Sequence, residues 1–147
     1  MVEPVIKIEF EEPENGWLPV KIKSGEIEEY FLASNIPENP VYRLESVLDS
    51  AITGVGGEVC WHLEPVGYFL KIYPANNNFH VTLEYSNNAI GGKREQLFHI
   101  TGGTKEIVLP IWRALRKIQS HNYSEFGVSQ KGMESITKYV NAYKLKG

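Results

Sequence analysis

Alternation of apolar and polar residues in the middle of the chain constrains its fold more than any other feature of the sequence. Val59, Trp61 and Leu63 are each separated by one residue, and the same period of two returns in later segments. Because successive side chains of an extended strand point to opposite faces, the pattern predicts strands with one packed face and one partly polar face. The predicted strands, which together form a four-stranded meander, span residues 58–64, 68–73, 79–85 and 94–100.

The first 33 residues carry the same signal and predict a three-stranded meander. Ile6, Ile8 and Phe10 alternate with polar residues. Asn15-Gly16 follows them, and this pair favours a hairpin turn between two strands. The predicted strands span residues 5–10, 17–23 and 26–33.

Three segments show the helical period instead, each preceded by a polar residue that can cap a helix. Pro40 suits the first position of the first helix, because the N–H group that proline lacks has no partner there. Pro110 falls inside the second apolar stripe, so it should kink that helix or mark its true start. The expected caps are Asn39 for the helix over 41–52, Thr104 for the helix ending near 118, and Ser129 for the helix reaching 143.

The order of elements is therefore βββ-α-ββββ-α-α, which is typical of an α+β protein. We predict an antiparallel sheet of about six to seven strands, with two amphipathic helices on one face and a third helix at the C-terminus. No linker is long enough to separate domains, so residues 1–147 are expected to form a single domain.

The cysteine content and the apolar segments indicate a cytoplasmic protein. Cys60 is the only cysteine, so no internal disulfide can form, which is typical of a reducing compartment. Residues 1–4 do not begin a signal peptide, and no apolar run approaches the roughly 18 residues of a membrane span. We expect no membrane association, no cofactor and no metal, since no zinc or phosphate-loop motif is present.

The charge is unevenly distributed along the chain. Residues 1–58 hold 12 acidic and 4 basic residues, a net charge of −8, whereas residues 59–147 hold 6 acidic and 11 basic residues, a net charge of +5. This asymmetry predicts an acidic surface for a basic protein partner, although charges also protect exposed sheet edges from unwanted pairing. Nucleic acid is an unlikely partner because the whole chain carries −3. The residues predicted to bind the partner are Trp17, Glu26, Glu28, Glu29 and Tyr30, and the other aromatic residues expected away from the core are Tyr42, Phe69 and Tyr73.

The second meander offers an alternative site for a small ligand or a metal, or for acid–base catalysis. His62 and Glu64 share one strand face, and His80 and Glu84 share the face of a later strand. If the strand register aligned them, these four side chains would form a pocket. The same spacing also occurs on any solvated polar sheet face. Cys60 lies two residues from His62 but has no nucleophile signature, so a small buried or half-buried cysteine is expected instead.

The middle of the chain resembles the small immunity proteins of bacterial polymorphic toxin systems. The resemblance lies in the run Trp61-His62-Leu63-Glu64-Pro65 and in the strands Tyr68–Tyr73 and Phe79–Tyr85 that follow it. It implies an intracellular protein that binds and blocks a cognate toxin, and it assigns no role to any single residue.

These observations favour a non-enzymatic binding protein with an acidic and aromatic surface. The first alternative is a small-ligand or metal-binding protein or enzyme that uses the His/Glu set. The second alternative is a structural homo-oligomer, joined through an exposed sheet edge or through the C-terminal helix.

Overall fold

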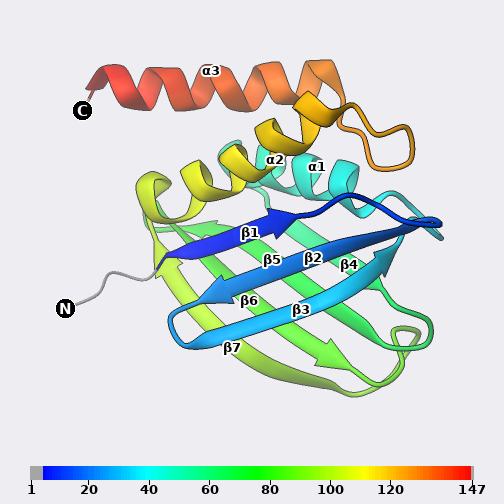
Figure 1. The fold of residues 1–147 in the computed structure, drawn as a ribbon. Helices are drawn as coiled ribbons and strands as arrows, with labels where there is room; N and C mark the ends of the chain where they lie inside the picture. Colours follow the sequence, from blue (N-terminus) through cyan, green and yellow to red (C-terminus); the bar gives the residue numbers. More distant parts are fainter. Residues whose placement is uncertain (1–4, 147) are drawn as a thin grey trace.

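Seven strands form two antiparallel sheets in the computed structural model, which describes residues 5–146. Residues 1–4, where the sequence indicated no signal peptide, and Gly147 lie outside the described part. The first sheet has the strand order β1-β2-β3 and the second has the order β4-β5-β6-β7 (Figure 1). The strands are β1 (Ile6–Phe10), β2 (Trp17–Ser24), β3 (Ile27–Ser34), β4 (Gly57–His62), β5 (Gly67–Ala75), β6 (Asn78–Ser86) and β7 (Arg94–Gly102).

The helices lie together on one side of the strands, as Figure 1 shows. Helix α1 packs along β4 and helix α2 along β1, and α3 forms the outermost layer on α1 and α2. Within the described residues, no helix has the length and apolar character needed to cross a membrane. The helical elements are α1 (Pro40–Ile52), the π-helical turn η1 (Thr104–Val108), α2 (Leu109–His121) and α3 (Gln130–Lys146). The predicted α+β class, the order of elements and the C-terminal third helix are confirmed.

Aromatic side chains join the two sheets through their inner faces. Phe31 of β3 stacks on Tyr68 of β5, with ring centroids 4.3 Å apart and an interplanar angle of 12°. Trp61 of β4 is fully buried beside Phe31 and Phe10, at centroid distances of 6.0 Å and 6.1 Å. Because each sheet buries its apolar face against the other, seven strands form two packed layers rather than one wide sheet.

The caps predicted for the first and third helices are confirmed. The Asn39 side chain accepts hydrogen bonds from the backbone N–H groups of Val41 (3.0 Å) and Tyr42 (3.3 Å), with Pro40 as the first helical residue. Ser129 Oγ accepts a hydrogen bond from the N–H of Gly132 at 3.0 Å. Each side chain satisfies donors that have no partner within the helix.

The predicted cap of the second helix is wrong. The Thr104 hydroxyl bonds to the Tyr139 hydroxyl at 2.7 Å and does not cap a helix, because the chain first makes the π-helical turn η1. The Glu106 side chain closes this turn by accepting the N–H of Gly103 at 2.7 Å. Pro110 is the second residue of α2, so its interpretation as the true start of that helix is confirmed.

Glu45 links α1 to α3 in a nearly water-free position. The residue is 1% exposed, and its Oε1 accepts a hydrogen bond from the N–H of Ser129 at 3.1 Å. Its Oε2 has no hydrogen-bond partner within residues 5–146. A Cβ atom on Gly132 would lie 2.8 Å from the Glu45 carboxyl carbon, so glycine lets the two helices approach. Burial raises the pKa of Glu45 above its ordinary value.

Glu45→Gln is expected to reduce the decrease in the free energy of unfolding that wild type shows as the pH rises. The folded protein holds a proton on Glu45 more tightly than the unfolded chain does, because its pKa is raised. Wild type therefore loses stability as the pH rises from about 4.5 through the raised pKa. The variant keeps an acceptor for Ser129 and should be at least as stable at about pH 7, as measured by urea unfolding across this range. Glu134→Gln on the exposed side of α3 is the control, and an unchanged pH slope in Glu45→Gln would contradict the assignment.

Candidate functional site

The outer face of the first sheet gathers large apolar side chains in solvent. Strand register places Trp17 opposite Ser34, and Pro19 opposite Leu32. Tyr30 and Leu32 are 55% and 47% exposed, whereas Trp17 and Pro19 are partly buried. We call these four residues, Trp17, Pro19, Tyr30 and Leu32, the β3 patch. Trp17 and Tyr30, two of the residues predicted to bind a partner, thus lie on one face.

The predicted glutamates do not share this face. Glu28 lies beside Tyr30 on the outer face, opposite Lys23, and Glu26 lies in the turn between β2 and β3. Glu29 belongs to the inner side, where it accepts a hydrogen bond from the Tyr68 hydroxyl at 2.9 Å. The interpretation of all three glutamates as one acidic surface is therefore wrong, because neighbouring residues of a strand point to opposite faces.

Lysines also occupy the outer face of the first sheet, so it is not uniformly acidic. Lys21 lies between Glu9 of β1 and Tyr30 of β3, and Lys7 lies opposite Lys23. Lys7 also forms an ion pair with Glu9 at 3.1 Å. These basic residues belong to β1 and β2, whereas the charged residues of β3 itself are both acidic. Only one of these two, Glu28, lies on the outer face, so the acidic residues of this face are Glu28 at the β3 edge and Glu9 on β1, where Glu9 is paired with Lys7.

Two of the four sheet edges are covered by helices. Helix α2 runs along β1, and α1 runs along β4, where Arg43 Nε donates a hydrogen bond to the carbonyl of Glu58 at 3.1 Å. In the described chain, β3 and β7 each pair with one strand only. Strand β7 begins with the exposed residues Arg94, Glu95 and Gln96, and its pairing with β6 is irregular at Leu83/Glu84. Charge and irregular pairing protect a sheet edge from unwanted pairing, and β7 has both. Strand β3 instead exposes Tyr30 and Leu32, so it is the less protected of the two open edges.

The outer face of the second sheet carries a network of opposite charges. Arg94 pairs with Glu58 and, at 3.3 Å, with Glu84, and Lys71 pairs with Glu84 at 3.2 Å. The Arg94 guanidinium lies 3.5 Å from the ring centroid of Phe69. Phe69 is only 3% exposed, so the expectation that it faces solvent is wrong: Arg94 and its partners cover the ring.

The predicted His/Glu pocket does not assemble. His62 ends β4 opposite Gly67, whereas His80 lies opposite Tyr73, six residues further along β5 and thus about 20 Å away. Glu84 is held by the charge network, and Glu64 follows β4 near His62. Among residues 5–146, no three His, Cys, Asp or Glu side chains are arranged to hold a metal ion.

His80 instead meets His99, a residue that the sequence interpretation did not single out. The His80 Nδ1 and His99 Nε2 atoms lie 3.4 Å apart. The pairing of β6 with β7 creates this neighbourhood. From the sequence, His80 and His99 could only be assigned to two consecutive predicted strands. Their contact could not be predicted without the register in which β6 pairs with β7.

Cys60 is half-buried on the outer face of β4, which is one of the two environments that the sequence predicted. Burial, together with the smaller effect of the neighbouring Glu58 carboxylate, raises the pKa of Cys60 to about 11. A thiol with this pKa is mostly protonated at neutral pH and is therefore a poor nucleophile.

Alkylation of Cys60 by iodoacetamide is expected to be slow in the folded protein. With a pKa of about 11, on the order of one thiol in a thousand is ionised at about pH 8, against roughly a quarter for an ordinary cysteine. The rate in the native protein should be on the order of a hundredfold below that of the urea-unfolded chain. Mass spectrometry of timed samples measures both rates, and equal rates would contradict the raised pKa.

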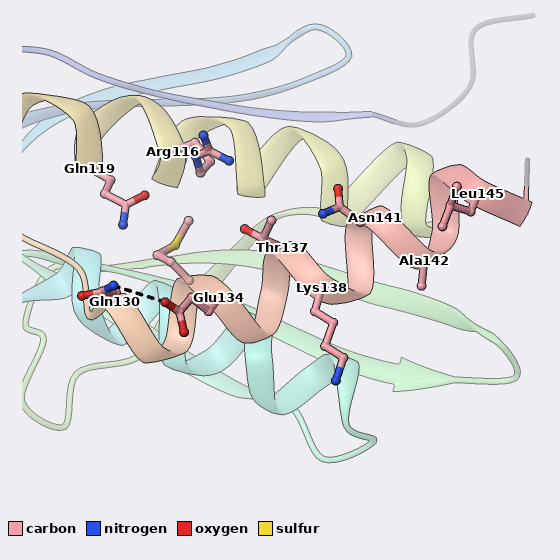
Figure 2. A pocket seen from close by; sticks show the side chains of 10 residues that line it. Arg116, Gln119, Gln130, Glu134, Thr137, Lys138, Asn141, Ala142 and Leu145 are labelled. Carbon is pink, nitrogen blue, oxygen red and sulfur yellow. Dashed lines mark hydrogen bonds between the residues drawn. The ribbon is translucent and has the colours of Figure 1, made fainter.

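A groove of about 660 Å³ lies between α2 and α3 (Figure 2). Figure 2 shows Arg116 and Gln119 of α2 on one wall and residues of α3 on the other, with Gln130 donating a hydrogen bond to Glu134 at 3.2 Å. Trp112 Nε1 bonds to Thr137 Oγ1 at 3.0 Å and joins the two helices. The lining residues carry charges of both signs. Their polar groups do not point to one place in the groove (Figure 2), so they do not indicate which kind of ligand would bind there.

Comparison of the chain with protein families, with curated proteins and with solved structures found no match.

Proposed function

We propose that this chain is a non-enzymatic binding protein of the cytoplasm, which takes up a protein partner along the open edge of β3. The observation that carries the proposal is the exposure of Tyr30 and Leu32 on an edge strand that pairs on one side only within the described residues. An edge strand offers unpaired backbone groups to an incoming strand, and adjacent apolar side chains supply contact area.

The charges near this edge favour a basic partner segment. A strand added to β3 would lie directly opposite its residues, and on the outer face these are Glu28, Tyr30 and Leu32. Cross-strand neighbours of opposite charge stabilise a sheet, as do pairs of apolar residues. The partner strand would therefore carry Lys or Arg opposite Glu28 and apolar residues at the next two outer positions, while Glu26 in the adjacent turn would add long-range attraction.

The double variant Tyr30→Thr/Leu32→Lys is expected to weaken partner binding by at least about tenfold, because it removes the apolar anchors and adds charge to the edge. Both sites are exposed, so each change should alter the free energy of unfolding by no more than about 0.5 kcal/mol. Partners would be isolated from an extract of the native cells on immobilised wild type. Calorimetric titration would then measure the affinity of each variant.

Tyr73→Thr is the matched control, because Tyr73 is 45% exposed on the outer face of the second sheet. It should bind the partner as wild type does. Equal affinity of wild type and the Tyr30/Leu32 variant would overturn the proposed interface.

Glu26→Gln/Glu28→Gln is expected to slow association and to weaken its dependence on ionic strength, since exposed charges act chiefly on the encounter rate. Glu29→Gln is the control, because the Glu29 side chain bonds to Tyr68 on the inner side and keeps an acceptor after the change. Stopped-flow association at several salt concentrations measures the effect. Unchanged rate and salt dependence in the double variant would rule out steering by these glutamates.

Neutralisation of a cognate toxin is the specific form of this proposal, in line with the resemblance to immunity proteins. Production of the chain together with a candidate toxin should protect the cells, and the Tyr30→Thr/Leu32→Lys variant should protect them less. If the variant protected the cells as well as wild type does, toxin neutralisation would not depend on the β3 edge, and this form of the proposal would be wrong.

The same open edge also suits pairing between two copies of the chain, which would give a structural homo-oligomer. Sedimentation across a dilution series distinguishes the two cases. A dimer that dissociates in the Tyr30→Thr/Leu32→Lys variant would favour self-association over a separate partner, and a monomer at every concentration would exclude it.

A further inference from the structure

His80 of β6 and His99 of β7 are neighbours on the outer face of the second sheet. His80 lies opposite Thr101 and His99 lies opposite Thr82, so the two imidazoles meet diagonally across the strand pair. Their ring centroids are 5.5 Å apart, with an angle of 31° between the planes. His99 is exposed and His80 is partly exposed, so a solute can reach the pair.

The separation of the two ring nitrogens suits a shared metal ion. His80 Nδ1 and His99 Nε2 are 3.4 Å apart. Two nitrogens bound to one tetrahedral Zn²⁺ at about 2.0–2.1 Å are separated by roughly 3.3–3.4 Å. A modest rotation of each ring would direct both lone pairs at one point, and the torsion next to an imidazole allows this because its energy well is broad.

A hydroxyl group on the neighbouring position fixes the orientation of His99. His99 Nδ1 lies 2.8 Å from Thr82 Oγ1. When Nδ1–H donates to this oxygen, the lone pair is on Nε2 and faces His80, which is the arrangement that metal-binding histidines use. Thr101 Oγ1 lies 3.2 Å from His80 Nδ1, so a further neutral oxygen borders the same space.

We propose that His80 and His99 form a two-histidine site for a late first-row divalent cation, with Zn²⁺ as the representative ion. Imidazole nitrogen is a favoured ligand for these cations. No third His, Cys, Asp or Glu joins the pair in the described part of the chain, so water completes the coordination. The site is independent of the β3 edge, which belongs to the other sheet.

The test is a titration of the tag-free chain with Zn²⁺, followed by NMR and by calorimetry. The chain has four histidines, so the imidazole signals can be assigned with single variants. One Zn²⁺ per chain should bind, and the signals of His80 and His99 should shift while those of His62 and His121 do not. Shifts spread over all four residues, or no binding, would overturn the proposal.

Variants separate the two ligands from their surroundings. His80→Gln and His99→Gln should each weaken Zn²⁺ binding by at least about tenfold, and Thr82→Val by about tenfold through loss of the acceptor for His99. His62→Gln, on the same sheet face but at its other end, is the control and should bind Zn²⁺ as wild type does. Circular dichroism checks that each variant is folded. Equal Zn²⁺ affinity in wild type, His80→Gln and His99→Gln would refute the site, whatever the fate of the proposed partner interface.

Discussion

Packing of Phe31 against Tyr68 and Trp61 holds the two sheets together. It joins the inner faces of the two sheets, with Phe31 and Tyr68 stacked at 4.3 Å and Trp61 fully buried beside them. Aromatic side chains bury a large area each and favour stacked or edge-on geometries, so they fix how one sheet lies on the other. Once that packing is set, every second residue of each strand is assigned to the interior or to solvent.

The helices complete this core and at the same time determine which sheet edges stay open. Helix α1 covers β4 and α2 covers β1, while α3 reaches the core through the buried residues Met133, Ile136 and Val140. Buried Glu45 then joins α1 to the start of α3 through the Ser129 amide. The two edges away from the helices, β3 and β7, differ in how they are protected. The proposed partner interface follows from this difference, because β3 carries exposed apolar side chains, Tyr30 and Leu32, on an open edge.

The two outer sheet faces show that polar composition alone does not make a site. On the second sheet, Glu58, Lys71, Glu84 and Arg94 satisfy one another and cover Phe69, so these charges stabilise the surface. Exposed ion pairs of this kind contribute modestly to stability, and more when they form a network with good geometry. The His80 and His99 pair lies on the same face, and its ring nitrogens have no carboxylate partner among the described residues.

Local elements could be predicted from the sequence: the period of two indicated the strands, and Asn39, Pro40 and Ser129 indicated two helix starts. These signals suffice because they depend on backbone geometry and on residues close along the chain. Four other features became visible only in the folded chain: the strands form two sheets, Arg94 covers Phe69, His62 and His80 lie far apart, and His80 meets His99. Those outcomes depend on register and on contacts between distant segments, and a one-residue shift in register would send every side chain of a strand to the other face.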